Sequence, residues 1–392
     1  MIELNYKVGR NMKLNEKRIV NDIRLLALDM INAAGSGHPG IALDAAPTLY
    51  TLFAYHLKFD LERKAWCNRD RFVLSAGHGS ALLYSTLYYL LDEFNLEELK
   101  NFRKINSQCT GHPEYNLNNR IEVTTGPLGE GFATSVGLAI GEKYLESTFN
   151  KKKNIVFDYK IYTLVSDGDL MEGISYEAAS LAGNLGLDNL IVLYDSNGVT
   201  ADGDLDKAMY ENIPDRFASM NWEVIKVKDG ENIGEISNAI EKAKKSKKPV
   251  LIEIKTTLGI YSKYEGTNRI HSNLDKEDLE EIRTKLKGGP AFTYSENDRN
   301  NAMKFIKDGT EDYYRNWYSE YEMYIANATD SERDKINLVI ENEKISLDIA
   351  AVIDTSKIFE DKAMRDINYQ IMNVISTFIP NFMGGSADLF CS

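Results

Sequence analysis

Two apolar segments of the sequence each end in a short polar turn that could bind a cation. Asp167 and Gly168 directly follow the segment at 161–166, and Asn197 stands in the turn after the segment at 189–194. Ligands of open parallel sheets bind outside the carboxyl ends of the strands, so a carboxylate, an amide oxygen and a backbone carbonyl could converge there. Such oxygen ligands suit Mg²⁺ or Ca²⁺, with a phosphate supplying further oxygens.

Each of these turns, taken by itself, has a simpler interpretation. Asp167 could cap the helix that follows it, and the tetrapeptide at 195–198 could be an ordinary surface turn. Two polar turns at the ends of consecutive predicted strands are harder to explain in that way. We therefore favour a shared cation site, which requires the side chains of Asp167 and Asn197 to lie together.

Four of the five histidines lie in short turns, most of which contain glycine or proline. These are His38, His78, His112 and His271. Imidazole can donate or accept a proton near neutral pH, and glycine lets backbone N–H groups approach an anion closely. We expect a site that handles hydroxyls, phosphates or protons. The fifth histidine, His56, stands in an apolar run and is expected to be an ordinary core or helix-face residue.

A glycine-rich loop at 124–131, with the sequence TTGPLGEG, opens a segment of helical character. A loop of this kind before a helix can seat a phosphate or a flat heteroaromatic ring. Simple packing between the loop and the helix would explain the glycines equally well, so the loop by itself is weak support for a site.

Strand-like and helical segments alternate over the first 275 residues, and this alternation predicts a parallel sheet. The predicted strands are 70–75, 161–166, 189–194, 223–227 and 249–256. The predicted helices are 15–34, 174–187, 235–245 and, further on, 361–380. Because the strands at 161–166 and 189–194 are almost continuously apolar, they should be buried on both faces. We predict an α/β fold, a doubly wound parallel sheet with helices on both faces.

The character of the sequence changes after about residue 275. We expect a sheet domain at 1–275, a helical extension or linker at 276–355, and the beginning of a further domain at 356–392. The chain stops directly after an apolar turn and a glycine pair, in the segment NFMGGSADLFCS. We therefore expect it to be truncated or to be one part of a longer protein.

The composition favours a soluble cytoplasmic protein. A formal net charge of -13 argues against a general nucleic-acid binder, although a local anion-binding pocket remains compatible with it. Three cysteines at unrelated spacings, Cys67, Cys109 and Cys391, suggest neither a disulfide framework nor a zinc site. No apolar run approaches the roughly 20 residues of a membrane span, and the N-terminus lacks the apolar core of a signal peptide.

Several motifs in one order resemble the N-terminal part of the transketolase family of thiamine diphosphate enzymes, from about Ile23 to the last residue. They are SGHPG, DRFVLSAGHGS, LKNFR, GHPE, TTGPLGEG, SDGDLMEGISYEAASLAGNLGL, YDSNGV and GGSADL. The most specific is an Asp-Gly pair followed by an Asn, here separated by 197 − 167 = 30 positions. The resemblance implies a thiamine diphosphate-binding fold.

The resemblance also implies how the cofactor is bound. A divalent cation, Mg²⁺ with Ca²⁺ or Mn²⁺ as alternatives, would be held by Asp167, Asn197 and the backbone carbonyl of Val199. Further residues would contact the thiamine diphosphate itself. These are His78 and Gly168 at the diphosphate, Gly126 and Leu128 at the aminopyrimidine, and Asp388 near the thiazolium.

For the substrate, the resemblance implies three histidines with catalytic roles. His38, His112 and His271 would face the sugar and handle its hydroxyl protons. Glu172 matches a glutamate at the interface between the family's two cofactor sites. Two further residues, Arg365 and Ser392, fall where the family binds the sugar phosphate.

The implied activity is thiamine diphosphate-dependent transfer of a two-carbon ketol unit from a ketose phosphate to an aldose phosphate, in the pentose phosphate pathway. The family's active site forms between two subunits, so we expect a homodimer or a complex with a C-terminal partner chain. The glutamate that protonates the aminopyrimidine lies beyond Ser392 in the family, so the chain alone should turn over poorly.

Alternative functions stay open at this point. Dihydroxyacetone synthase shares nearly all of these motifs, whereas GHPE and GGSADL disfavour the deoxyxylulose phosphate synthase. A non-catalytic cofactor-domain protein that acts through a partner is the third alternative. Three residues depart from the family pattern: Ser166 replaces a glycine before the Asp-Gly pair, Glu130 replaces a common glutamine, and Asn268 stands where a second histidine is frequent.

Overall fold

The computed structural model describes residues 13–340, 348–353, 362–379 and 381–386. The chain divides into two compact units, Met1–Glu322 and Met323–Ser392. None of the described helices is long and apolar enough to cross a lipid bilayer.

The first unit is built on one parallel sheet of five strands, in the order β1-β2-β3-β7-β6. The strands are β1 (Arg71–Leu74), β2 (Ile161–Ser166), β3 (Leu190–Ser196), β6 (Glu223–Val227) and β7 (Val250–Lys255). All four neighbouring pairs are parallel, and Ser166 at the end of β2 is in register with Asp195 in β3. This confirms the predicted parallel sheet. Strand β3 runs two residues further than predicted, because Asp195 and Ser196 continue its pairing with β7.

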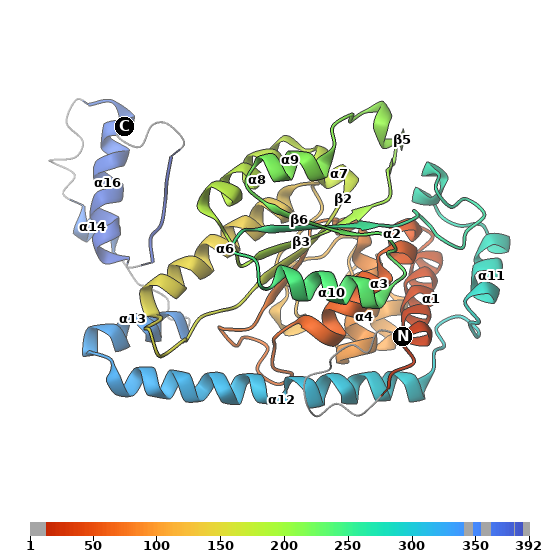
Figure 1. The fold of residues 1–392 in the computed structure, drawn as a ribbon, viewed down its shortest axis with the longest axis horizontal. Coiled ribbons are helices and arrows are strands. Elements are labelled where there is room, and N and C mark those ends of the chain that lie inside the picture. The colour runs from red at the N-terminus through yellow and green to blue at the C-terminus, as the bar shows by residue number, and fades with distance from the viewer. Residues whose placement is uncertain (1–12, 341–347, 354–361, 380, 387–392) are drawn as a thin grey trace. The chain divides into compact units, whose positions relative to one another are not determined.

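Helices cover both faces of this sheet, as the sequence predicted (Figure 1). On one face lie α6 (Glu130–Phe149), α8 (Gly173–Leu185) and α9 (Ile213–Ser219). On the other lie α3 (Ala46–Thr51), the π-helical turn η1 (Leu52–His56), α4 (Ser80–Leu91) and α10 (Ile233–Ala243), with α1 (Glu16–Ala34) packed on α4. Helix α1 ends, as expected, at Gly35, whose φ of 65° stops the helix.

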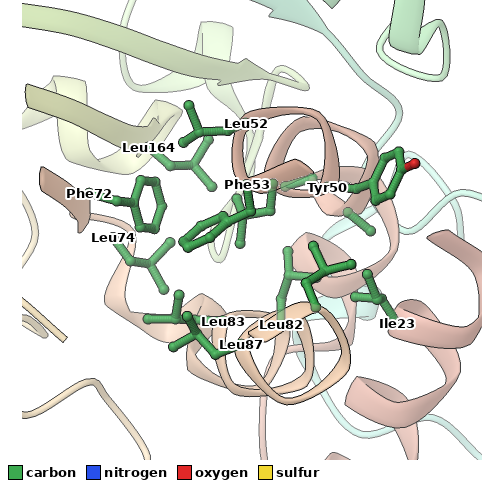
Figure 2. Packing of buried hydrophobic residues seen from close by; sticks show 14 of the residues in the cluster. Ile23, Tyr50, Leu52, Phe53, Phe72, Leu74, Leu82, Leu83, Leu87 and Leu164 are labelled. Atoms are coloured by element: carbon green, nitrogen blue, oxygen red, sulfur yellow. The ribbon is translucent and has the colours of Figure 1, made fainter. Parts of the chain in front are cut away.

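Packing on both faces of the sheet explains why β2 and β3 are almost continuously apolar. Phe72 and Leu74 of β1 and Leu164 of β2 face η1 and α4, where Phe53 packs edge-on against Phe72 at 5.3 Å between ring centroids (Figure 2). The intervening residues, such as Val165, are buried under the helices of the opposite face. Every residue of β2 and β3 is therefore buried.

Short elements join these layers and carry much of the candidate site. They are α2 (Pro39–Asp44), η2 (Gly77–Gly79), α5 (Leu96–Lys100), η3 (Leu117–Asn119), α7 (Asp167–Met171), the two-stranded pair β4 (Val199–Thr200) and β5 (Gly203–Asp204), η4 (Leu205–Lys207) and η5 (Asn268–His271). Elements this short carry no periodicity that the sequence could reveal.

The described part of the chain after residue 275 is mainly helical, as expected. It contains α11 (Lys276–Lys285), α12 (Glu296–Asn327), α13 (Asp330–Ile340), α14 (Ile349–Val352) and α16 (Met364–Phe378). Leu279 and Ile282 of α11 pack against Leu25 and Leu28 of α1. The compact unit therefore runs past residue 275, and the three domains that we predicted remain a proposal about functional segments.

Candidate active site

A cavity of about 430 Å³ opens at the carboxyl ends of β2 and β3. It brings together residues from segments far apart in the chain, among them most of the site residues that the sequence predicted. These are His38, His78, His112, Gly126, Leu128, Gly168, Glu172, Asn197, Val199 and His271. The position agrees with the rule that open α/β sheets bind ligands at the carboxyl ends of their strands.

The two acidic turns are joined by hydrogen bonds. The Asp167 carboxylate accepts bonds from the backbone N–H groups of Asn197 (3.3 Å) and Gly198 (2.9 Å), and from the Tyr194 hydroxyl. Burial raises the pKa of Asp167 above its ordinary value, and these three donors oppose that effect. The Asp167 side chain is therefore bonded to the turn after β3, and the simpler interpretation of Asp167 as a helix cap is wrong.

The side chain of Asn197 has a defined orientation. Its Nδ2 donates to Asp44 Oδ2 (3.3 Å) and to Asp195 Oδ2 (3.2 Å), while its Oδ1 accepts from the Val199 N–H (3.1 Å). Thr256 Oγ1 donates to the other Asp195 oxygen at 2.5 Å. Burial raises the pKa of Asp195 to about 7. The opposite orientation of the amide would place its oxygen against the Oδ2 atoms of both Asp44 and Asp195.

The helix that follows β2 is capped by Ser166 and Asp169. Ser166 N and Oγ donate to Asp169 Oδ2 at 3.0 and 3.1 Å, a capping box, and Ser166 has an extended backbone that accepts a side chain without strain (φ −112°, ψ 173°). The other Asp169 oxygen accepts from Ser75 Oγ and Gly129 N, both at 2.9 Å. Asp169 was missed by the sequence analysis, although the S-x-x-D spacing could have indicated the cap.

Three glycines allow these loops to approach one another closely. A Cβ on Gly77 would lie 2.9 Å from the backbone nitrogen of Gly126, and one on Gly131 would lie 2.6 Å from the Cα of Ser75. A Cβ on Gly168 would lie 3.1 Å from Leu128 Cδ1, so a side chain there would narrow the cavity. The glycine-rich loop is therefore held between the ends of β1 and β2.

The histidines of the cavity form a neutral cluster. The ring centroid of His38 lies 5.1 Å from that of His78 and 6.5 Å from that of His271. Burial lowers the pKa of His38 to about 4 and that of His78 to about 3, with a further lowering from neighbouring charged groups. It also lowers the pKa of His112 and of His271. His38 Nδ1 and His271 Nε2 are buried and have no hydrogen-bond partner among the described residues.

Glu130 and Asn268, which depart from the family pattern, and Glu172, which matches it, all lie near the cavity entrance or in its neighbouring loops. Glu130 is the exposed first residue of α6, and Glu172 is exposed at the junction of α7 and α8, where it lines the cavity. The Asn268 amide donates to the Ala201 carbonyl at 3.3 Å and so joins two loops beside the cavity.

Three predicted site residues lie either in the second unit or outside the described residues. Arg365 is on α16 with an exposed side chain, 3.7 Å from Asp366. Asp388 and Ser392 lie outside the described residues. The roles of these three residues remain predictions.

His56 and the described cysteines have no part in the cavity. His56 is buried and contacts Ser237 Oγ at 2.8 Å and Glu241 at 3.0 Å, which confirms it as a core residue. Cys67 and Cys109 are free thiols, while Cys391 lies outside the described residues. Within the described part of the chain, no three or more His, Cys, Asp and Glu side chains form a group that could hold a metal. A cation at Asp167 would depend on neutral oxygens as well.

The family model for transketolase, thiamine diphosphate binding domain, matches residues 15–343. The chain belongs to the transketolase family. The matched range includes the whole sheet and every residue that lines the cavity, so the cavity lies in the thiamine diphosphate-binding domain of the family.

Full-length relatives extend well beyond this chain. It is 43% identical to the transketolase of Bacillus subtilis (strain 168) over 384 residues, which cover 95% of this chain and 56% of that protein. It is 40% identical to the transketolase of Aquifex aeolicus (strain VF5), over 97% of this chain and 55% of that protein. The chain spans about half the length of the curated transketolases it matches.

Solved transketolases share the fold. The enzyme from Leishmania mexicana superposes with a TM-score of 0.88 at 34% identity, over 96% of this chain and 56% of that one. The Pichia stipitis enzyme in complex with sedoheptulose 7-phosphate has the same TM-score and identity, with 95% and 56% covered. The Campylobacter jejuni enzyme superposes with a TM-score of 0.84 at 36% identity, over 96% of this chain and 58% of that one.

Proposed function

We propose that this chain supplies the cofactor-binding part of a transketolase. A divalent cation, Mg²⁺ in first place and Ca²⁺ or Mn²⁺ as alternatives, would bind to Asp167, Asn197 and the Val199 carbonyl and hold the diphosphate of the cofactor. The observation that carries the proposal is the hydrogen bonding between the two strand-end turns, which places the carboxylate of Asp167 against the backbone of Asn197.

The residues of the cavity suit thiamine diphosphate. Gly168 and His78 are proposed to contact its diphosphate, and Gly126 and Leu128 its aminopyrimidine, since all four line the cavity. The unpartnered nitrogens of His38 and His271 leave hydrogen-bonding capacity for a bound molecule. When bound, thiamine diphosphate supplies the carbon nucleophile and stabilises the two-carbon unit, chemistry that no side chain provides.

The chain's own contribution to catalysis is proton handling and orientation. His38, His112 and His271 are neutral at pH 7, because burial lowers the pKa of each. A neutral imidazole can accept a proton from a sugar hydroxyl and return it later. We assign these three histidines to the hydroxyls of the substrate, and Glu172 to the contact between two cofactor sites.

The proposed substrates are sugar phosphates. Pichia stipitis transketolase has been crystallised with sedoheptulose 7-phosphate, and mutants of that enzyme with xylulose 5-phosphate and fructose 6-phosphate, which supports this class. Arg365 and Ser392 are proposed to bind the phosphate and Asp388 to lie near the thiazolium. The reaction would transfer a ketol unit between a ketose phosphate and an aldose phosphate, in the pentose phosphate pathway of the cytoplasm.

The active unit is proposed to be a homodimer or a complex with a chain that supplies the remainder. Because the chain spans about 56% of the Bacillus subtilis relative, we expect weak cofactor binding and little turnover from the chain alone. A ketol-transfer assay with xylulose 5-phosphate and ribose 5-phosphate, with and without a C-terminal transketolase chain, tests this. Activity is expected only with both chains, and failure to bind thiamine diphosphate with Mg²⁺ in either case would contradict the proposed function.

A further inference from the structure

Asp44 is a buried carboxylate beside the proposed cation site that the proposed mechanism does not use. It is the last residue of α2 and only 1% exposed. Its Oδ2 accepts the bond from Asn197 Nδ2 at 3.3 Å, and its Oδ1 has no hydrogen-bond partner among the described residues. Burial raises the pKa of Asp44 well above its ordinary value, and the neighbouring Asp195 raises it further, so the protonated form of this carboxyl group is favoured. A buried carboxyl group with so few partners is unfavourable for the stability of the fold.

Nearby positive charge does not explain why Asp44 is buried. The charge of Arg24 lowers the pKa of Asp44 but does not outweigh burial, and Arg24 itself donates to the Leu43 carbonyl at 2.6 Å and forms its ion pair with Glu231. Asp44 therefore has no ion pair of its own within the described residues. Among the described side chains, that of Asn197 donates a hydrogen bond to Asp44.

Helix α2, which carries Asp44 at its last position, is tightly packed at its first turn. His38 occupies the N-cap position of this short helix, and Gly40 packs so tightly on Leu258 that a Cβ would lie 2.7 Å from Leu258 Cδ1. The carboxylate thus meets Asn197 from a helix that cannot shift easily. The other contact to Nδ2 comes from Asp195, at the end of β3.

An oxygen of each of two carboxyl groups accepts a hydrogen bond from the Asn197 amide nitrogen, and this arrangement favours a single orientation of the amide. Reversal would place Oδ1 against Asp44 and Asp195, where like partial charges repel. With Nδ2 held between them, Oδ1 lies on the side of Val199, whose carbonyl is the other proposed neutral ligand. Residues behind a metal ligand commonly set its orientation and its affinity in this way.

We propose that Asp44 is a positioning residue, which holds the Asn197 amide with its oxygen directed to the cation. This rests on the proposed function, because it presupposes a cation at Asp167 and Asn197. Asp44 neither touches the cation nor takes part in proton transfer. It contributes by excluding the amide orientation that would not bind metal.

The test compares Asp44→Leu with Asp44→Asn by titrating Mn²⁺ in the presence of thiamine diphosphate and measuring free Mn²⁺ by electron paramagnetic resonance. If the chain needs its C-terminal partner to bind cofactor, all proteins are measured with that partner. Asp44→Leu removes the acceptor and should weaken Mn²⁺ binding about tenfold, the lower end of the range for such residues. Asp44→Asn keeps one acceptor oxygen and should stay within about threefold of the parent.

A second measurement separates positioning from a purely structural role. Without metal, Asp44→Leu should unfold in urea at or above the parent's midpoint, because it removes a poorly paired buried carboxylate. The control Asp29→Asn, at a buried carboxylate bonded to Arg283 and to the Phe292 N–H, should lower the midpoint and leave Mn²⁺ affinity unchanged.

The outcomes distinguish the two proposals. If the parent binds Mn²⁺ and Asp44→Leu binds it equally well, the role of Asp44 is overturned while the proposed function stands. That role is overturned as well if Asp44→Leu loses affinity and stability together and Asp44→Asn does not restore them. If the parent itself binds no Mn²⁺ with thiamine diphosphate, both proposals fall.

Discussion

At the scale of single residues, burial determines the protonation state of the histidines in the cavity. His38 and His78 lie close together, and both are held neutral because the protein removes them from water. In a chain with a formal net charge of -13, exposed histidines would tend to gain protons. Neutral rings can donate through one nitrogen and accept through the other, which a substrate rich in hydroxyl groups requires.

The contribution of these two rings to the stability of the chain should fall on mild acidification. Unfolded histidines titrate near 6.5, whereas His38 and His78 have pKa values of about 4 and about 3 in the fold. Between pH 7.5 and 5.0 the unfolded state therefore binds more protons than the native state, and the free energy of unfolding drops by roughly 1–2 kcal/mol for each histidine.

Urea denaturation of the parent and of His78→Asn, each at about pH 7.5 and pH 5.0, measures this loss of stability. The variant should lose less stability than the parent over the same interval. The comparison is made between the two proteins because Asp195, with a pKa raised to about 7, acts in the opposite direction and loses its contribution as the pH rises. An equal loss in both proteins would show that His78 titrates normally.

At the scale of elements, Asp169 connects three parts of the chain. It caps α7 through Ser166, and it also holds Ser75 after β1 and Gly129 before α6. The bond from the Gly129 N–H to Asp169 therefore helps to position the glycine-rich loop. The backbone of the loop accordingly depends on a residue 40 positions away in the sequence.

Asp169→Asn should destabilise the chain, although it preserves size and shape. The amide nitrogen would replace an acceptor oxygen and face N–H or O–H donors, which costs about 1–3 kcal/mol for a buried group left unsatisfied. Chemical denaturation measures the change, and the exposed Asp206→Asn is the control with no expected effect. A stability equal to that of the parent would mean that water or a shift of the loop satisfies these donors.

Two helical glycines should respond oppositely to alanine. A Cβ on Gly183 of α8 would lie 1.7 Å from the Met220 carbonyl oxygen, so Gly183→Ala must push α8 away from the turn before β6, at about 3 kcal/mol or more. Gly137 of α6 has nothing within 4 Å of such a Cβ, so Gly137→Ala should stabilise the chain by about 0.5–1 kcal/mol. Thermal unfolding of both variants decides this, and effects of the same sign would contradict it.

At the scale of the whole molecule, the compact first unit needs the helix that follows the predicted domain boundary. Leu279 and Ile282 cover Leu25 and Leu28, and Arg283 forms an ion pair with the buried Asp29. Removing α11 would expose the apolar side chains and leave Asp29 without its cation. Breaking a buried pair in this way typically costs about 3–5 kcal/mol.

A chain ending at residue 275 should therefore melt at a lower temperature than one ending at residue 322. Circular dichroism of the two truncated proteins measures the difference, and the full 392-residue chain serves as the reference. We expect the 322-residue protein to unfold cooperatively near the reference. Equal melting temperatures for the two truncations would instead support 275 as the end of an independent domain.

Local patterns in the sequence determined the strands of the sheet and several helices, whereas α4, which is buried on all sides, was missed. Continuous β-branched runs indicated buried strands, and apolar residues at helical spacing indicated the helices, because both signals lie within one segment. Asp167, Asn197 and the four turn histidines were also visible, since their residue types are unusual at strand ends and in glycine turns. These residues converge because parallel strands present their carboxyl ends at one edge.

Only the tertiary structure decided which side chains support that site. Asn197 meets Asp44 across 153 positions, and Asp169 meets Ser75 across 94. Neither pair has a local signal, because an aspartate in a helix or turn looks the same whether it faces water or another residue. Such contacts arise from strand order and from the tight packing of glycine loops, and these are set when the whole sheet assembles.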